Sequence, residues 1–254
     1  MIALSFGKNI AVRCISLSFA SIGALISGCA LNEQSADTQQ IDIGIVGYAR
    51  ALSVEVSSDK VKSLGSASWL SSDLVITASH LFLNMPEGSQ VRVGKNGYWV
   101  EADVVAIEDP AIRDLAILRV QSGTNIQSPI ARSASVPVCE KQLQSAQEVV
   151  VVSEFHHGSS HSYGSPDYVR HHQGAAWTNH LTGHYPEGTS GGALYEVESG
   201  CLAGVVSRRS ESHATGAPSI YSTEFVTAKE ISQFLLDNGV MFPEVAGVGA
   251  AYSE

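Results

Sequence analysis

The stretch Glu187–Ala193 reads EGTSGGA and places one serine, Ser190, between glycines at the start of an apolar run. Gly188 can adopt backbone angles that turn its N–H group toward the serine. Together with the N–H of Ser190, this group would hold an oxygen that develops negative charge. Because turns of small residues are common, the stretch by itself is typical either of an exposed nucleophile or of an ordinary turn.

Two further motifs precede this stretch on segments that read as strands. Residues 69–80 (WLSSDLVITASH) indicate a strand, a tight turn and a second strand that ends on His80. Residues 114–118 (DLAIL) begin with Asp114 and continue as an apolar strand. The order along the chain is therefore histidine, aspartate and then Ser190.

The three motifs, in this order, resemble those of the chymotrypsin-like (trypsin-fold) serine proteases. That family carries Thr-Ala-Ala-His, Asp-φ-Ala-φ-Leu and Gly-Asp-Ser-Gly-Gly motifs, where φ is apolar. This chain has TASH at 77–80, DLAIL at 114–118 and GTSGG at 188–192. The resemblance extends over about residues 41–240. It implies two six-stranded antiparallel β-barrels of chymotrypsin type with a C-terminal α-helix, a polypeptide substrate and no cofactor.

The resemblance also assigns a role to one residue of each motif. Ser190 would be the nucleophile, and its hydroxyl needs a base within hydrogen-bond reach because it is weakly nucleophilic at neutral pH. His80 would be that base, since imidazole titrates near neutral pH. Asp114 would accept the other ring N–H of His80 and fix its tautomer. The N–H groups of Gly188 and Ser190 would form the oxyanion hole.

Thr189 departs from the family pattern at the position before the nucleophile. The digestive enzymes carry an aspartate there, which pairs with a new N-terminus made by zymogen cleavage. Thr189 cannot form that ion pair. The sequence therefore predicts an enzyme that is competent without this activation step.

Local sequence patterns favour the same fold class. From residue 41 onward, short segments rich in valine, isoleucine and aromatic residues recur between turn residues, which is typical of an all-β barrel or sandwich. One helix closes the chain, because Thr227 and Glu230 have the spacing of a capping box and residues 237–239 (DNG) form a usual helix end.

We expect five consecutive parts in the chain. They are a lipoprotein signal peptide (1–28), a lipidated flexible tether (29–40), an N-terminal β-barrel (41–130), a C-terminal β-barrel with the closing helix (131–240) and a loose tail (241–254).

The N-terminus has the pattern of a secretory signal. Lys8 and Arg13 precede an apolar stretch, residues 14–26, which is shorter than the roughly 20 residues that a spanning helix needs. Residues 25–29 (LISGC) resemble the lipobox of bacterial lipoproteins. This implies cleavage before Cys29 and a lipid on that cysteine; the alternative is ordinary secretion with a chance cysteine. We expect a membrane-anchored protein of the bacterial cell envelope, and interpret the membrane as the outer one.

The charge of the chain bears on its partners. The formal net charge is −10, and loss of Lys8 and Arg13 with the signal would make it more negative. An acidic chain without a basic run argues against nucleic acid as a partner. We expect a monomer.

The four cysteines fall into two groups. Cys14 lies in the signal and Cys29 would carry the lipid, which leaves Cys139 and Cys201. An even pair in an oxidising compartment favours a disulfide. Two buried free thiols are the alternative, because the sequence does not say how close the two Cα atoms come.

Four residues are candidates for substrate binding. By family geometry, the residue six before Ser190 lies at the base of the primary specificity pocket, and here it is His184. The strand that ends at Ser207 would pair with the substrate backbone, and Arg208 and Arg209 would extend it. No aspartate at the pocket base argues against trypsin-like specificity, and these basic residues favour acidic or polar side chains. A solvated surface is the alternative for the two arginines.

A histidine-rich segment spans residues 156–184. It is either an exposed loop with incidental histidines or a site for zinc, copper or protons. Because the spacings match no standard closed zinc site and no cysteine lies among them, we assign no metal. The histidines are His156, His157, His161, His171, His172, His180 and His184.

Two functional hypotheses follow. The first is a lipid-anchored serine endopeptidase that works through His80, Asp114 and Ser190 and an acyl-enzyme intermediate. The second is a catalytically silent module of the same fold that binds peptide or metal through the histidine-rich segment. The complete set of three catalytic residue types favours the first.

Overall fold

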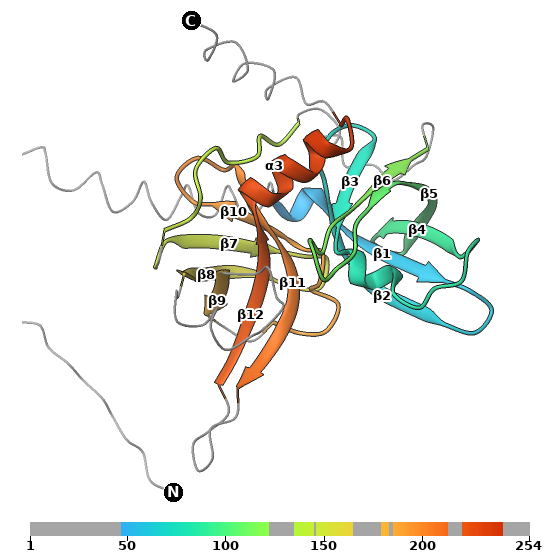
Figure 1. The fold of residues 1–254 in the computed structure, drawn as a ribbon, viewed down its shortest axis with the longest axis horizontal. Coiled ribbons are helices and arrows are strands. Elements are labelled where there is room, and N and C mark those ends of the chain that lie inside the picture. The colour runs from blue at the N-terminus through green and yellow to red at the C-terminus, as the bar shows by residue number, and fades with distance from the viewer. Residues whose placement is uncertain are drawn as a thin grey trace, which may run out of the picture.

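The computed structural model describes residues 47–121, 135–144, 146–164, 179–182, 185–212 and 220–240. In these residues the chain forms two closed antiparallel β-barrels side by side, and a C-terminal helix packs over them (Figure 1). The predicted fold class is therefore confirmed. The predicted signal, tether and tail lie outside the described residues.

The first barrel joins its strands in the order β1-β2-β3-β6-β5-β4, and β1 pairs with β4 to close it. A short 3-10 helix, η1 (Ser79–Phe82), follows β3. The strands are β1 (Ala51–Ser57), β2 (Lys62–Trp69), β3 (Leu74–Thr77), β4 (Gln90–Lys95), β5 (Tyr98–Ile107) and β6 (Ala116–Val120).

The second barrel has the order β10-β11-β12-β9-β8-β7, and β10 pairs with β7 to close it. Strand β10 thus has β11 on one side and β7 on the other. The strands are β7 (Glu148–Val152), β8 (His157–Gly164), β9 (Asn179–Thr182), β10 (Ala193–Glu196), β11 (Leu202–Ser212) and β12 (Ile220–Thr227).

Strand β7 shows why a continuous apolar run suits this architecture. Successive side chains of a strand point to opposite faces. Val149 and Val151 belong to the apolar cluster inside the second barrel, whereas Val150 and Val152 belong to the cluster between the barrels. Because both faces of β7 are buried, the strand reads as four valines rather than as an alternation of polar and apolar residues.

The helix α3 (Ala228–Asp237) begins and ends where its sequence predicts. Thr227 Oγ1 accepts the N–H of Glu230, and the Glu230 carboxylate accepts the N–H of Thr227, which completes a capping box. Ile231 and Phe234 are buried in the cluster between the barrels. Figure 1 shows α3 above both barrels, so the helix holds them together.

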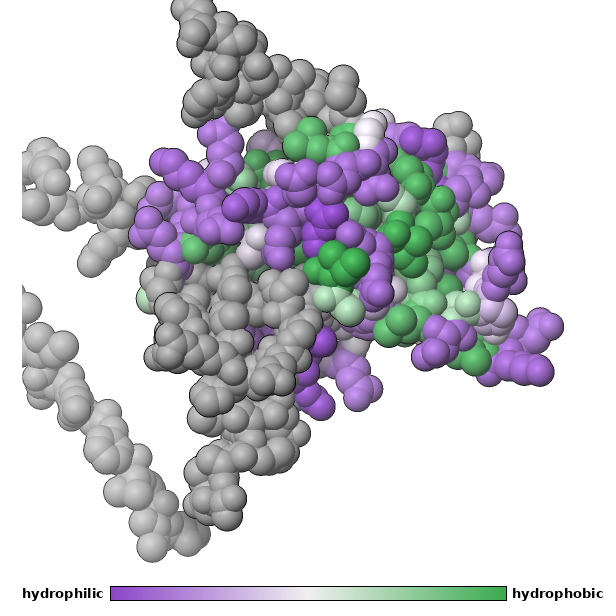
Figure 2. Space-filling model, in the orientation of Figure 1, coloured by the Kyte–Doolittle hydropathy of each residue, from purple (hydrophilic) through white to green (hydrophobic). Residues whose placement is uncertain are grey.

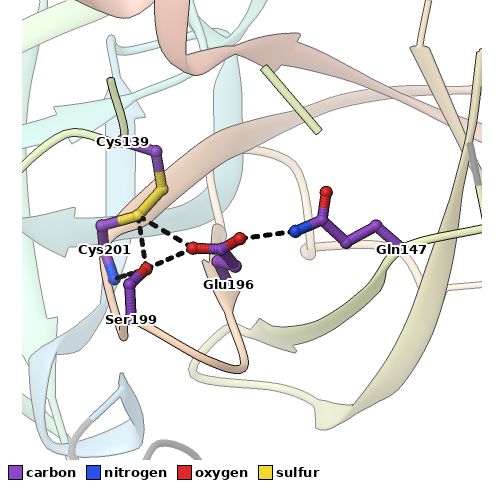
Figure 3. Close-up of a disulfide and its surroundings, with 5 residues drawn as sticks. All are labelled: Cys139, Gln147, Glu196, Ser199 and Cys201. Carbon is purple, nitrogen blue, oxygen red and sulfur yellow. Dashed lines mark hydrogen bonds between the residues drawn. A yellow bond between two sulfur atoms is a disulfide. The ribbon is translucent and has the colours of Figure 1, made fainter. Parts of the chain in front are cut away.

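The structure pairs Cys139 with Cys201 in a disulfide (Figure 3). Cys139 lies on the segment that enters the second barrel, and its N–H donates to the carbonyl of Leu202 over 3.0 Å. Ser199 and Gln147 both donate to the carboxylate of Glu196 beside the disulfide. The bond therefore ties the entering segment to the β10–β11 turn.

The surface of the described residues is mixed in polarity. Figure 2 shows apolar side chains among polar ones over the first barrel, and β5 exposes Val104, Val105 and Ile107. No helix in the described parts of the chain has the length and hydropathy needed to cross a membrane.

Candidate active site

Pairing of two strands in the first barrel brings His80 and Asp114 together. Strands β3 and β6 lie side by side, with Thr77 opposite Ala116. The sequence predicted that the second strand would end on His80, but this was wrong: β3 ends at Thr77 and His80 lies on η1. The change of direction brings the backbone N–H of His80 within 2.7 Å of Asp114 Oδ1.

The carboxylate of Asp114 holds His80 at two points. Its Oδ1 accepts the backbone N–H of His80, and its Oδ2 lies 2.7 Å from His80 Nδ1. Two attachments to one residue fix both the position and the plane of the imidazole. The Asp114 side chain is 3% exposed, whereas the His80 side chain is 29% exposed.

Two serine hydroxyls complete the environment of Asp114. Ser79 Oγ donates to Oδ1 over 3.2 Å, and Ser207 Oγ donates to Oδ2 over 2.5 Å. Burial raises the pKa of the Asp114 carboxyl, but the hydrogen bonds from His80 and Ser207 outweigh this effect and place the pKa below its usual value. An ionised carboxylate only accepts hydrogen bonds, so Nδ1 of His80 carries a hydrogen, and Nε2 is the acceptor nitrogen of the neutral ring.

Sequence reasoning missed the part that the hydroxyls of Ser79 and Ser207 play. Ser207 was predicted to bind substrate through the backbone of its strand, and the structure adds that its side chain donates to Asp114. The available signal was a serine at the end of each of two apolar runs, LVITAS at 74–79 and LAGVVS at 202–207. A buried hydroxyl needs a hydrogen-bond partner, but local sequence does not name that partner.

Ser190 lies on the loop before β10, and hydrogen bonds to both barrels position this loop. The carbonyl of Ser190 accepts the N–H of Ser66 in β2 over 2.7 Å, and the N–H of Gly191 donates to Val206 in β11 over 2.7 Å. Gly191 has φ of 86°, and a Cβ atom there would lie 2.0 Å from the Ser66 carbonyl oxygen. Only glycine fits this close approach.

The hydroxyl of Ser190 forms no hydrogen bond within the described residues, with His80 or otherwise. Ser190 is half-buried. On one side its loop is bonded to Ser66, whose carbonyl also accepts the Thr77 hydroxyl. On the other side the loop is bonded to Val206, and the next residue, Ser207, donates to Asp114. In unliganded enzymes, catalytic hydrogen bonds are often long and shorten only when substrate binds. The geometry therefore brings the three candidates to one junction but does not join serine to base.

The loop offers two backbone donors at this junction. Gly188 has φ of 88°, and its carbonyl accepts the hydroxyl of Ser66 over 2.6 Å. Within the described chain, the N–H groups of Gly188 and Ser190 donate to no acceptor, whereas those of Thr189 and Gly192 donate to nearby carbonyls. Two free N–H groups on one loop are the kind of donors that an oxyanion requires.

The Thr189 side chain, which the sequence singled out, is buried. Its hydroxyl has no hydrogen-bond partner among the described residues. Such an environment would not accommodate the charge of an aspartate without a partner. The threonine is therefore suited to a loop that is formed without an ion pair.

A pocket of about 250 Å³ opens beside Ser190, on the β11 side of the loop. Its lining includes Tyr185, Ser207, Arg208 and Arg209. Burial raises the pKa of the Tyr185 phenol. Three of the four predicted substrate-binding residues thus border this pocket, and the fourth, His184, lies outside the described residues.

One of the two pocket arginines is tied to a buried acid. Arg208 Nε donates to Glu224 Oε2 over 2.6 Å, and the Glu224 side chain is almost fully buried in β12. The carboxylate balances the charge of Arg208 and fixes its stem at the pocket wall. Arg209 is exposed at the same wall.

Only part of the histidine-rich segment can be described. The ring of His156 packs edge-on against Tyr185 with centroids 5.2 Å apart, and His180 is buried in β9. In the described residues the one cluster of possible metal ligands is Cys139, Glu196 and Cys201. Its two sulfurs are joined in the disulfide, so they are not available as thiolates. The side chains of the other five histidines lie outside the described part of the chain.

Comparison with known proteins agrees with this architecture. Residues 65–205, more than half of the chain, match the family described as the trypsin-like peptidase domain. No curated protein sequence gives a significant match.

Three solved structures resemble the fold. The active form of the Rv3671c protease from M. tuberculosis is 18% identical, with 90% of this chain and 96% of that chain covered and a TM-score of 0.54. An inactive serine-to-alanine mutant of Rv3671c is 19% identical, with 79% and 92% covered and a TM-score of 0.51. The serine endoprotease from Yersinia pestis is 19% identical, with 78% and 66% covered and a TM-score of 0.52. Because the family match runs from β2 into β11 and the structural likeness extends over both barrels, the chain belongs to the trypsin-like peptidase family.

Proposed function

We propose that this protein is a serine endopeptidase that hydrolyses polypeptides through an acyl-enzyme intermediate on Ser190. The observation that carries the proposal is the double attachment of His80 to the Asp114 carboxylate, at 2.7 Å through the backbone and 2.7 Å through Nδ1. This attachment orients the imidazole so that Nε2 can act as the base at the junction where the Ser190 loop lies.

The same groups act in both half-reactions, and in each of them His80 first takes a proton and then donates it. His80 takes the proton of Ser190 as the hydroxyl oxygen attacks the scissile carbonyl carbon. The N–H groups of Gly188 and Ser190 stabilise the resulting oxyanion, which is worth roughly 3–4 kcal/mol per donor in comparable sites. His80 then protonates the leaving amine as the C–N bond breaks. In the second half-reaction water attacks the acyl carbon, His80 takes its proton, and that proton returns to the Ser190 oxygen as the acid product leaves.

Covalent labelling with a fluorophosphonate tests this proposal. The purified protein should label, whereas Ser190→Ala and His80→Ala should not, because one lacks the nucleophile and the other its base. Ser58→Ala removes an exposed serine of the β1–β2 turn and serves as the matched control, which should label like the native protein. A folded native protein that fails to label would contradict the proposal and favour the catalytically silent binding module.

We propose a preference for acidic or polar side chains in the pocket beside Ser190. Arg209 and the outer part of Arg208 border this pocket, and Arg208 is held there by Glu224. A library of peptides that vary before the cut site tests the preference. Arg209→Gln should lower kcat/KM for acidic peptides by about tenfold relative to neutral ones. An unchanged ratio would assign the arginines to the solvated surface.

We also propose secretion and lipid anchoring through Cys29, as a monomer of the cell envelope. The lipobox-like sequence supports this, and the Cys139–Cys201 disulfide suits an oxidising compartment. An alkyne-tagged palmitate supplied to a Gram-negative host should label the native protein and not Cys29→Ala, while Cys14→Ala should retain label. Absence of label on the native protein would favour ordinary secretion.

A further inference from the structure

The Ser190 loop has two flanks that follow from the pairing of β10. Ala193 at the start of β10 pairs with Val205 of β11 on one side and with Val152 of β7 on the other. The pocket lined by Arg208 and Arg209 lies on the β11 flank. A substrate whose acyl part fills that flank must direct its leaving part toward the end of β7.

The chain beyond β7 forms a tight turn at Ser153–His156, directly on this second flank. The hydroxyl of Ser153 accepts the N–H groups of Phe155 and His156 over 3.2 and 2.8 Å. The N–H of Ser153 donates to the carbonyl of His156 over 2.6 Å. Ser153 is 0% exposed, so a buried hydroxyl holds the shape of the turn.

Contacts on both sides fix this turn in place. Glu154 accepts hydrogen bonds from Lys95 Nζ over 3.4 Å and from the N–H of Asn96 over 3.2 Å, both in the β4–β5 hairpin of the first barrel. The ring of His156 packs against Tyr185 at the specificity pocket. The residue between them, Phe155, is therefore anchored through both of its neighbours.

Phe155 lies against the backbone of Gly188. A Cβ atom at Gly188 would come within 2.9 Å of Phe155 Cδ2 and 3.1 Å of Cε2. The ring is nevertheless 45% exposed, and it does not line the pocket on the β11 flank. Scattered exposed apolar residues are ordinary. This one differs because a hydrogen-bonded turn holds its ring against Gly188, whose N–H belongs to the proposed oxyanion hole.

We propose that Phe155 is a specificity-determining residue that forms an apolar wall for the leaving side of the substrate. The wall favours an apolar side chain immediately after the scissile bond, because such a side chain covers the exposed part of the ring. This inference rests on the proposed endopeptidase function. It adds a preference for the residue after the scissile bond to the preference in the pocket beside Ser190.

Two peptides that differ only in the residue after the scissile bond, leucine or serine, test the wall. Native protein should cleave the leucine peptide with about tenfold higher kcat/KM, as expected for a partly open apolar contact. Phe155→Ala should bring this ratio close to one, whereas Phe155→Leu should keep most of it. Leu236→Ala truncates a similarly exposed apolar side chain on α3 and should leave the ratio as in the native protein.

A second readout separates recognition from any effect on the shape of the Gly188 loop. Added leucine amide and serine amide compete with water for the acyl-enzyme made from an ester, so their partition reports binding on the leaving side alone. Native protein should transfer the acyl group to leucine amide preferentially, and Phe155→Ala should lose this preference.

The outcomes separate failure of this inference from failure of the proposed function. A native protein that neither labels with fluorophosphonate nor cleaves either peptide would contradict both the apolar wall and the endopeptidase function. A native protein that labels and cleaves but shows no preference for leucine, or a Phe155→Ala variant that keeps the preference, would overturn the apolar wall and leave the endopeptidase standing.

Discussion

At the scale of single residues, the site depends most on Asp114, whose carboxylate accepts hydrogen bonds from Ser79, His80 and Ser207. Ser207→Ala removes one bond to an ionised, buried group. We expect it to lower the free energy of unfolding by about 2 kcal/mol at neutral pH. It should also lower the rate of fluorophosphonate labelling, because Asp114 is then held less firmly against His80.

The loss of stability in Ser207→Ala should depend on pH. Although burial raises the pKa of Asp114, hydrogen bonds from His80 and Ser207 hold it below the ordinary value of 3.8. The stabilisation that depends on its charge is thus present above that value and is lost as pH falls through the lowered pKa of the folded state. The native–variant difference in free energy of unfolding should be constant above about pH 5 and shrink below pH 3.8.

Denaturant series at several pH values measure this difference, with Ser58→Ala as the control. A difference that does not vary with pH would contradict this account.

At the scale of elements, α3 combines a local start signal with long-range packing. Thr227→Ala removes the acceptor for the N–H of Glu230 and should lower the free energy of unfolding by about 1 kcal/mol. Because Ile231 and Phe234 belong to the core between the barrels, loss of the cap should shift the unfolding of the whole protein rather than fray the helix alone. Urea denaturation measures the effect, and Lys229→Ala on the exposed side of the same turn should change little. Equal stability of Thr227→Ala and native protein would show that packing alone sets the helix start.

At the scale of the whole molecule, the disulfide joins two segments 62 residues apart in sequence. A double Cys139→Ser, Cys201→Ser variant should lose about 4 kcal/mol of stability, because the unfolded chain regains the freedom of a long loop. The disulfide lies at the end of β10 away from Ser190. The double variant, where it is folded at 25 °C, should therefore still label with fluorophosphonate. Thermal unfolding and labelling of the same sample measure both quantities. Loss of labelling without unfolding would show that the disulfide positions the active site.

Much of the fold could be predicted from the sequence, because its signals are local. The valine run of β7 and the Thr227–Glu230 capping box appear in the structure as their patterns indicate. The three motifs that contain His80, Asp114 and Ser190 indicated the candidate catalytic residues and their order along the chain. The place of His80 was not predicted correctly, because the hydrogen bond that turns the chain onto η1 comes from a residue 34 positions away.

The sequence by itself determined the all-β class, the start of the closing helix and the residue types of the candidate site. These properties follow from side-chain periodicity and from backbone preferences over a few neighbouring residues. Only the tertiary structure decided that Ser207 donates to Asp114 across 93 positions and that Phe155 lies on Gly188. Closure of the two barrels brings such distant segments into contact, and no local pattern encodes which of many buried hydroxyls or exposed rings will meet there.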